Sequence, residues 1–414
     1  MRQIDELPRL DYFDRKVAAD PDAAVLTIAE SDWIARTPFG VAVIRYDECF
    51  RLLRDQRLSA PPDFGMSEHG VKQGMAQQAM SKSLMVLHGE EHRRLRNLIA
   101  PALSRENADR FRPAIRDYLD ELITPVEGRG QADLVAEIAV PLPPRVMCVW
   151  LGFPESHAMQ MSGWADKLNK VMSIDVRKHL AQIESCMAEV TDYVMTRIEE
   201  LRGQNGEDTL SILIRAEEHG DRLTNQEMVN LVLLSIVAGS DTTRLQLGNA
   251  LWLFAHHPAQ WAALAEDPSL IPIAVEELLR FRPVTFKSLR FTREDIEYND
   301  VLIPKGTFVE VINPGAHFDE SVYANPYDFD IRRFGERQRP QLTFGAGPHQ
   351  CAGQFLARAE LEEALNMLTQ RLPGLRLDDE DPKGVEWTPP FGAVQGPTRL
   401  PMRWTPAALA AQQS

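Results

Sequence analysis

The sequence predicts a mainly α-helical protein with a small β region, folded as a single large domain over residues 1–414. Three observations predict this class. Apolar residues recur with the helical period along most of the chain, runs typical of strands are few and short, and no repeat or low-complexity linker divides the 414 residues. A chain of this length can bury a large core.

Helical periodicity predicts most of the elements. The predicted helices span 47–53, 92–103, 107–122, 176–202, 208–218, 225–255, 258–266, 269–280 and 354–372. Thr224 and Glu227 match a capping box at the start of helix 225–255, and Pro258 stops that helix. Its centre is apolar on nearly all sides, yet it carries four polar residues from Ser240 to Thr243, which need a chemical reason because burying polar groups is costly.

The strand signals are confined to two regions. One strand is predicted at 40–46, and others lie within 296–312, where Asn299-Asp300 and Pro304-Lys305-Gly306 mark turns. The segment 60–87 is rich in Pro, Gly, Met, Gln and Ser and has no clear period, so it is predicted to be a long mobile connection.

Charge and cysteine content narrow the class of protein. A net charge of −15 argues against nucleic acid as a partner. The N-terminal residues mix charges and lack the apolar core of a signal peptide, and no apolar run could cross a bilayer, so we expect a soluble, cytoplasmic monomer without a membrane anchor. Four widely spaced cysteines argue against a disulfide framework.

The stretch FGAGPHQCAG, residues 344–353, places a cysteine in a glycine-rich loop directly before a predicted helix. The amides at a helix N-terminus favour thiolate over thiol at Cys351. No second cysteine or histidine stands at zinc spacing, so a single-thiolate site whose other ligands come from a cofactor fits best, and a haem iron meets that description. A buried structural cysteine is the alternative.

The pattern F-G-x-G-x-H-x-C-x-G resembles that of the cytochrome P450 haem-thiolate family, matching at each fixed position. The resemblance extends over essentially the whole chain through four further motifs in the family's order. It implies the cytochrome P450 fold, haem b as cofactor, Cys351 as the axial ligand of the iron, and Phe344, Gly345 and Gly353 around the ligand. In this family thiolate ligation favours cleavage of the O–O bond.

The second motif is Glu277-Leu-Leu-Arg280, whose Glu and Arg can pair on one helix face. The resemblance implies that this pair is buried and holds the loop below the haem, with a third, cationic partner. Asp328 stands where the family often has Arg or His, which leaves Arg332 and Arg333 as candidates for the third partner.

The third motif, HGEEHRRLR, places His92 and Arg96 on one helix face, where two donors could bind an anion. The resemblance implies that these two residues contact the haem propionates together with Arg290 and His349. Taken singly, each of these residues could be an ordinary surface cation.

The fourth motif, Ala238 to Thr243, resembles the family's oxygen-activation segment. Ala238 and Gly239 are small enough for close approach, and the Thr242 hydroxyl can bond to the carbonyl of Ala238, which weakens the helix. Activation of O2 consumes two protons, so Asp241 and Thr242 are the candidate catalytic relay. A polar kink satisfied by its own backbone is the alternative.

The last motif, PPFGAVQGPTRLPMRW, resembles the family's closing strands, and its tip from Phe391 to Val394 is expected to line the substrate pocket. Val284 and Phe286 are expected there as well, although core packing explains apolar residues at either place equally well. The segment 60–87 and the helices around 163–187 are expected to form the entrance. Their Met, Leu and Val content suits a lipophilic substrate such as a terpenoid, steroid, fatty acid or macrolide-like compound.

The resemblance therefore implies a monooxygenase that inserts one atom of O2 into a lipophilic substrate. About sixty residues follow Gly353, so we expect the electrons to come from NAD(P)H through a separate ferredoxin or flavodoxin. This partner is expected to dock over Cys351 on a basic patch comprising Arg93, Arg94, Arg337, Arg339 and Arg358. A peroxide-driven peroxygenase and a non-catalytic haem-binding protein are the alternatives.

Overall fold

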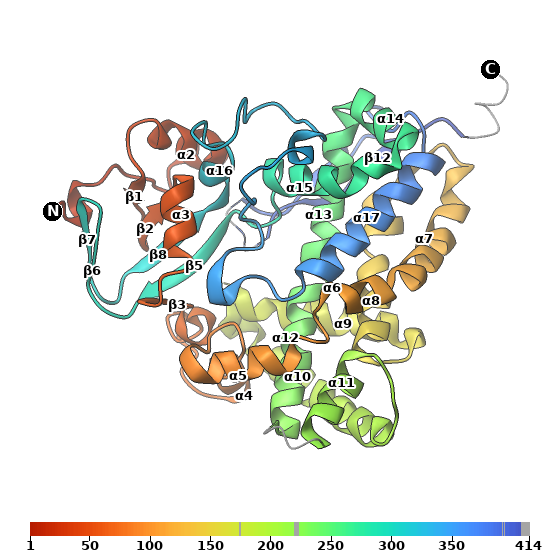
Figure 1. Ribbon diagram of the computed structural model, residues 1–414, viewed down its shortest axis with the longest axis horizontal. Helices are drawn as coiled ribbons and strands as arrows, with labels where there is room; N and C mark the ends of the chain where they lie inside the picture. The colour runs from red at the N-terminus through yellow and green to blue at the C-terminus, as the bar shows by residue number, and fades with distance from the viewer. Residues whose placement is uncertain (174, 219–222, 391, 393, 407–414) are drawn as a thin grey trace.

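The computed structural model describes residues 1–173, 175–218, 223–390, 392 and 394–406. Helices fill most of the molecule, and a smaller region of strands lies at the end that holds the N-terminus (Figure 1). The predicted class, mainly α with a small β region, is confirmed. No helix in the described part of the chain combines the length and apolar character needed to cross a membrane.

A five-stranded sheet forms the core of the smaller region. Its order is β1 (Ile34–Arg36), β2 (Gly40–Val43), β8 (Phe308–Ile312), β5 (Lys287–Thr292) and β3 (Leu58–Ser59). β2 and β8 run parallel, with Val41 opposite Val309, while β5 pairs antiparallel with β8. A Cβ at Gly40 would collide with the carbonyl oxygen of Phe308, which explains why glycine begins β2.

The remaining strands form small sheets. β6 (Ile296–Tyr298) pairs with β7 (Val301–Ile303), so the predicted strand region 296–312 divides into β6, β7 and β8. β12 (Pro401–Arg403) lies between β4 (Gln131–Asp133) and β9 (Arg376–Leu377), and β10 (Glu386–Trp387) pairs with β11 (Pro397–Arg399).

Most predicted helices are present with small shifts of their ends. They are α3 (Tyr46–Leu52), α5 (Gly89–Ile99), α10 (Val176–Leu201), α11 (Thr209–Glu218), α14 (Pro258–Glu266), α15 (Ile271–Phe281) and α17 (Gln354–Arg371). The predicted helix 107–122 is divided into α6 (Arg105–Arg110) and α7 (Arg112–Glu127). α9 (Ala158–Leu168) lies in the region around 163–187 where helices were expected without bounds. Besides α4, described below, the helices that the sequence did not predict are α1 (Arg15–Ala19), α2 (Pro21–Ala29), α8 (Leu142–Leu151) and α16 (Asn313–His317).

The predicted helix 225–255 is wrong in one respect, because it consists of two helices. α12 (Asn225–Gly239) ends where α13 (Asp241–Ala255) begins, and Ser240 joins them with φ −88° and ψ −59°. The predicted capping box is confirmed: the Thr224 hydroxyl accepts from the amide of Glu227 at 3.2 Å, and the Glu227 carboxylate accepts from the amide of Thr224 at 2.8 Å.

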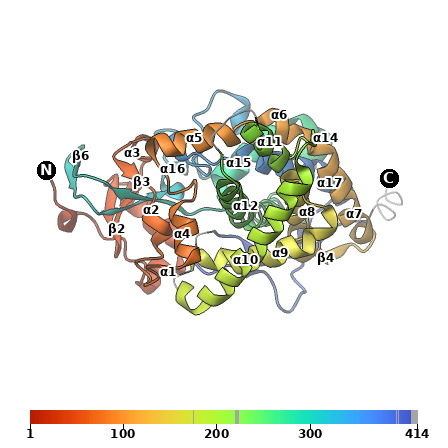
Figure 2. The ribbon, with the colours of Figure 1, turned by 90° about the horizontal axis from the view of Figure 1, so that it is seen from below.

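The segment 60–87 is more ordered in structure than the sequence predicts. It contains a 3₁₀ turn, Pro62–Gly65, and the helix α4 (Met75–Ser81), whose Ala76 and Met80 are buried. α4 lies beside α10 (Figure 2), and the carboxylate of Glu184 accepts from the amide of Ala76 at 3.3 Å. A seven-residue helix is too short to show a clear period, which explains why the sequence pattern missed it.

Candidate functional site

The loop 344–353 presents Cys351 at the start of α17, which lies on the near face in Figure 1. Gly345 and Gly347 have φ of +68° and +74°, values that favour glycine, and the amide of Cys351 donates to the carbonyl of Phe344 at 2.8 Å. A Cβ at Gly347 would lie 2.9 Å from the carbonyl oxygen of Leu53. The loop is therefore folded back on itself, and Cys351 is the exposed one of the four cysteines.

Opposing effects act on the Cys351 thiol. Burial by surrounding protein raises its pKa, while the amides of Gly353 and Gln354 and the charges of Arg96 and Arg358 lower it. The amides at the start of α17 thus favour thiolate as the sequence predicts, although burial has the larger effect and leaves the pKa of the thiol raised. The sulfur is nevertheless accessible, and coordination to a metal would stabilise the thiolate. No cluster of three His, Cys, Asp or Glu side chains that could hold a metal occurs among the described residues.

The four residues predicted to bind propionates come together next to this loop. The rings of His92 on α5 and His349 lie 4.4 Å apart, and Arg96 donates to the carbonyl of Gln350 at 2.8 Å. Burial, together with the neighbouring charges of His92, Arg290 and Arg96, lowers the pKa of His349 to about 3. Burial alone lowers the pKa of Arg290, which is 8% exposed, to about 10.

This cluster of His92, Arg96, Arg290 and His349 has no acidic counterpart. Within the described ranges, none of the four forms an ion pair with a carboxylate, whereas the buried Arg280 and the partly buried Arg333 and Arg112 do. Arg96 and Arg290 are therefore partly buried charges without a counter-ion, which is costly, while the lowered pKa values of His92 and His349 leave these two rings as neutral hydrogen-bond donors. A ligand with two carboxylates would offset that cost, so the residues present fit a haem, whose two propionates would lie here and whose iron would bind Cys351.

A buried ion pair supports the same loop from α15. Glu277 and Arg280 are both 0% exposed, and Arg280 donates to the two carboxylate oxygens of Glu277 at 2.7 Å each. The other nitrogen of the guanidinium donates to the carbonyls of His317, at 2.7 Å, and Pro326, at 2.9 Å. In turn, the ring of His317 accepts from the amide of Leu342 at 2.7 Å, two residues before Phe344.

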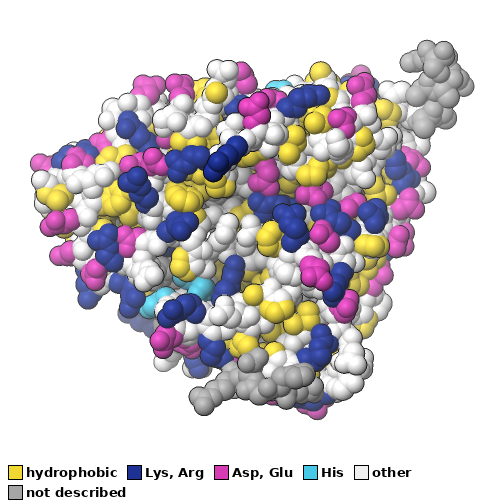
Figure 3. Space-filling view, in the orientation of Figure 1, with side chains coloured by type: hydrophobic (Ala, Val, Ile, Leu, Met, Phe, Trp, Pro, Cys, Tyr) yellow, Lys and Arg dark blue, Asp and Glu magenta, His cyan; other side chains and the backbone are white. Residues whose placement is uncertain are grey.

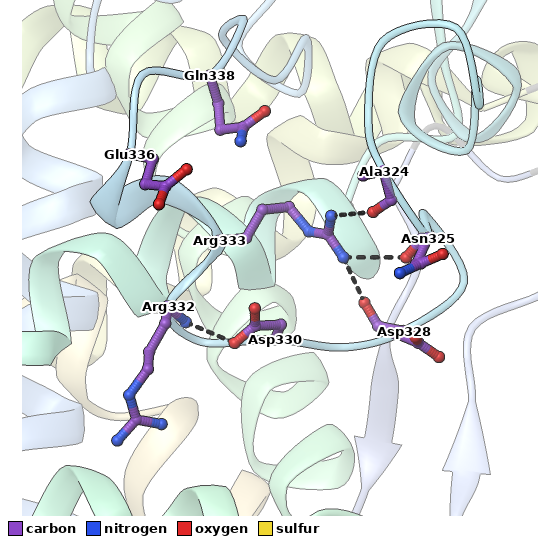
Figure 4. A pocket seen from close by; sticks show the side chains of 8 residues that line it. All are labelled: Ala324, Asn325, Asp328, Asp330, Arg332, Arg333, Glu336 and Gln338. Atoms are coloured by element: carbon purple, nitrogen blue, oxygen red, sulfur yellow. Dashed lines mark hydrogen bonds between the residues drawn. The ribbon is translucent and has the colours of Figure 1, made fainter.

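Arg333 is the third partner that the sequence left open. Its Nε lies 3.1 Å from the Glu277 carboxylate, and its terminal nitrogens donate to the carbonyls of Ala324, Asn325 and Asp328 (Figure 4). Arg332 points away from this cluster in Figure 4. Asp328 stands where the family often has Arg or His. The hydrogen-bond network around Glu277 is nevertheless complete, because Arg333 supplies the cation and Asp328 takes part only through its backbone carbonyl.

The candidate relay lies where α12 gives way to α13. The Thr242 hydroxyl donates to the carbonyl of Ala238 at 2.7 Å, as predicted, which takes that carbonyl out of regular helical bonding. Asp241 is bound on both oxygens, by Arg244 at 2.8 Å and by Asn169 of the segment after α9 at 2.7 Å. The carboxylate remains 25% exposed, so it can exchange protons with solvent.

The two small residues of this segment have different neighbours. Ala238 is exposed and lies one turn before Thr242 on the same helix face. A Cβ at Gly239 would lie 2.6 Å from the sulfur of Met147, so its small size allows α12 to pack against α8. Of the two small residues, Ala238 is therefore the one that a ligand could approach, because Met147 already packs against Gly239.

The predicted pocket residues divide into two groups. Phe286, directly before β5, is 2% exposed and packs in the core cluster with Leu10, Val25 and Ile312, which favours the core-packing alternative; its place in the pocket wall stays a prediction. Val284 lies outside the three core clusters, and its carbonyl accepts from the amide of Gln395 at 2.7 Å. Val394 is half-buried beside that bond. Phe391 lies outside the described residues.

The expected basic patch is partly neutralised. Lys and Arg side chains gather on the face shown in Figure 3, but Arg358 pairs with Glu276 at 2.5 Å, Arg339 pairs with Asp47 at 2.5 Å, and Arg94 pairs with Glu227. Arg93 is 71% exposed, with Glu90 4.0 Å away. Arg337 forms no ion pair with any residue that the structure describes. Arg93 and Arg337 therefore remain the most available cations of the predicted five.

Comparison with known proteins gives the same architecture over nearly the whole chain. The family model described as Cytochrome P450 matches residues 153–399. Over 401 residues the chain is 35% identical to luteothin monooxygenase of Streptomyces thioluteus, covering 96% of both chains. It is 33% identical to nocardicin C N-oxygenase of Nocardia uniformis subsp. tsuyamanensis over 401 residues, covering 95% of this chain and 98% of the relative.

Solved structures show the same likeness. CalO2 superposes with a TM-score of 0.87 at 28% identity, covering 97% of this chain and 100% of CalO2. P450BioI, solved in complex with hexadec-9Z-enoic acid ligated acyl carrier protein, gives a TM-score of 0.84 at 28% identity and covers 94% of this chain and 99% of its own. The helices and sheets described above are thus arranged as in these proteins.

Proposed function

The chain belongs to the cytochrome P450 family of haem monooxygenases, and we propose that it inserts one atom of O2 into a small lipophilic substrate, such as a terpenoid, steroid, fatty acid or macrolide-like compound. The other oxygen atom leaves as water, which consumes two electrons and two protons. Electrons come from NAD(P)H through a separate ferredoxin or flavodoxin. The observation that carries the proposal is the exposed Cys351 beside two arginines, Arg96 and Arg290, and two histidines, His92 and His349, none of which forms an ion pair with a carboxylate of the described residues.

Five residues of this chain hold the cofactor. Cys351 would ligate the iron, Arg96 and Arg290 would neutralise the propionates, and the neutral rings of His92 and His349 would donate hydrogen bonds to them. When bound, the haem supplies the binding and reductive activation of O2. Phe344, Gly345 and Gly353 shape the loop, and the Glu277–Arg280–Arg333 network fixes the segment that leads into it.

Asp241 and Thr242 move protons at this site. In the observed arrangement the Thr242 hydroxyl points its proton at the Ala238 carbonyl, so its oxygen is free to accept a hydrogen bond from a water molecule. Asp241 is reached from solvent, and a proton passes inward when its ion pair with Arg244 loosens. Asn169 keeps the carboxylate oriented while this occurs.

The redox partner approaches the face that carries Cys351. A surface of this kind favours an acidic protein, because exposed cations steer an acidic partner at low ionic strength. Arg93 and Arg337 supply the free charge, whereas Arg94, Arg339 and Arg358 are engaged by acids of the chain itself.

The substrate is lipophilic, but family membership does not select it. One relative is named for luteothin and another for nocardicin C, and P450BioI was solved with an acyl group carried by a protein. Incubation with a panel of lipophilic compounds, NADH, a ferredoxin and its reductase in isotope-labelled O2 tests the proposal. One labelled oxygen atom per product molecule is expected. A product whose oxygen comes from water would contradict it.

A further inference from the structure

Two buried amide side chains on α13 hold the backbone of both segments that border the proposed pocket. Gln246 is 2% exposed; its Nε2 donates to the carbonyl of Arg282 at 3.0 Å, and its Oε1 accepts from the amide of Val284 at 2.9 Å. Asn249, nearly one turn later, donates to the carbonyl of Gln395 at 2.9 Å. Because Gln246 uses both ends of its amide, neither a carboxylate nor an apolar side chain of similar size can make both bonds.

The two held segments also bond to each other. The amide of Gln395 donates to the carbonyl of Val284 at 2.7 Å, and the amide of Thr388 donates to the carbonyl of Gly396 at 3.0 Å, which closes the turn between β10 and β11. A Cβ at Gly396 would lie 2.8 Å from the carbonyl oxygen of Leu245 on α13. The turn therefore lies directly on the helix, and the three segments form one closed network.

The side chain of Arg282 ties the same segments together from the outside. Its guanidinium lies 5.0 Å from the ring of Trp252 on α13 and 4.8 Å from the ring of Trp387 on β10, and these two rings are 5.4 Å apart. Arg282 and Trp252 are half-buried and burial lowers the pKa of Arg282, while the Trp387 ring remains 37% exposed. Cation–π contacts are stronger when they are desolvated.

The helix that holds these segments also begins with the candidate relay. Gln246 lies four residues after Thr242, so the two side chains share one face of α13 about 5–6 Å apart. A displacement of the pocket segments from α13 would therefore change their position relative to Thr242. We propose that Gln246 is a positioning residue that determines substrate selection, because it fixes the segments at 282–284 and 395 relative to the site of oxygen chemistry. This inference rests on the proposed function.

Binding of two azoles that differ in size tests it. Imidazole can reach the iron without filling the pocket, whereas the added ring of 4-phenylimidazole must pack against the pocket walls. For Gln246→Met we expect the dissociation constant of 4-phenylimidazole, measured from the Soret shift, to rise about tenfold, equivalent to ~1.4 kcal/mol, while that of imidazole changes less than about twofold. Gln226→Met is the matched control, since the exposed side chain of Gln226 on α12 donates to the side chain of Asn230 and has no other hydrogen bond to the residues that the structure describes, and neither constant should change.

Two results would overturn the inference: equal weakening of both azoles, which indicates general loosening, or no change in either. If Gln246→Met yields no folded protein, Asn249→Leu removes the bond to Gln395 and carries the same expected ratio of constants. The reduced carbon monoxide spectrum of each variant separates this inference from the proposed function. A normal spectrum with unchanged azole selectivity refutes only the role of Gln246.

Discussion

Replacing Arg333 by Gln is expected to destabilise the protein strongly, whereas the same change at the adjacent Arg332 is expected to have almost no effect. The Arg333 side chain is 8% exposed, and it joins the buried Glu277 carboxylate to three backbone carbonyls. Removing one member of a buried ion pair typically costs about 3–5 kcal/mol, because the remaining charges stay buried. Arg332 bonds through its backbone amide to Asp330, and a surface substitution changes stability by about 0.5 kcal/mol or less.

Urea unfolding, followed by circular dichroism and by haem absorbance, measures the difference between the two variants. A chain of this length with a cofactor need not unfold in one step, so the comparison between matched variants is more informative than either absolute value. We expect Arg333→Gln to unfold at a clearly lower urea concentration and to lose haem first, because its network supports the loop that carries Cys351. Equal unfolding midpoints for Arg333→Gln and Arg332→Gln would refute the assignment of the third partner.

Three further predictions concern pH, partner docking and proton delivery. Burial and the nearby Arg280 lower the pKa of His317 to about 3, so the unfolded chain, with its ordinary His pKa of about 6.5, binds a proton that the folded chain does not. Stability should therefore be lost as pH falls from 6.5 toward 3, by up to ~1.4 kcal/mol per pH unit, and His317→Asn should flatten this dependence; parallel curves would contradict it. Reversing Arg93 and Arg337 to Glu should slow reduction by an acidic ferredoxin several-fold at low salt, as measured by stopped flow, and unchanged rates would reject the patch. Thr242→Ala should reduce product formation per NADH consumed about tenfold or more while peroxide-driven turnover is retained, and full coupling with O2 would exclude the relay.

The sequence predicted most of the helices because long amphipathic segments such as 176–202 carry an unambiguous period. It missed α8, which begins with consecutive prolines, and the short α4, because neither shows that period clearly. The sequence did not predict that the helix is interrupted at Ser240. It did predict the hydrogen bond from the Thr242 hydroxyl to the Ala238 carbonyl, from their i, i+4 spacing, and this bond weakens the helix at that point.

The candidate site was predictable where chemistry is concentrated in short motifs. Cys351, His92 and Arg96 stand out by residue type and spacing, and the structure places them together. Asn169 could not be predicted as a partner of Asp241, because 72 positions separate them and only the fold brings them into contact. Arg244 follows Asp241 by three residues, a spacing that favours an ion pair on a helix. That spacing alone does not distinguish a partner of Asp241 from an ordinary surface cation.

The pocket residues show why apolar side chains are hard to assign from sequence alone. Val284 and Phe286 are two residues apart, but only Phe286 joins a core cluster. In a regular extended segment two residues at this spacing face the same side, but the chain bends at Val284 and at Phe286 before β5 begins, and nothing in the residue types reveals those bends.

The most direct test of the account is the absorption spectrum of the reduced protein with carbon monoxide. The account predicts a strongly red-shifted Soret band for the natural chain, since a thiolate at Cys351 is the axial ligand, and loss of that band in Cys351→Ser. Absence of the band in the natural chain, or its persistence unchanged in Cys351→Ser, would contradict the assignment on which the proposed function rests.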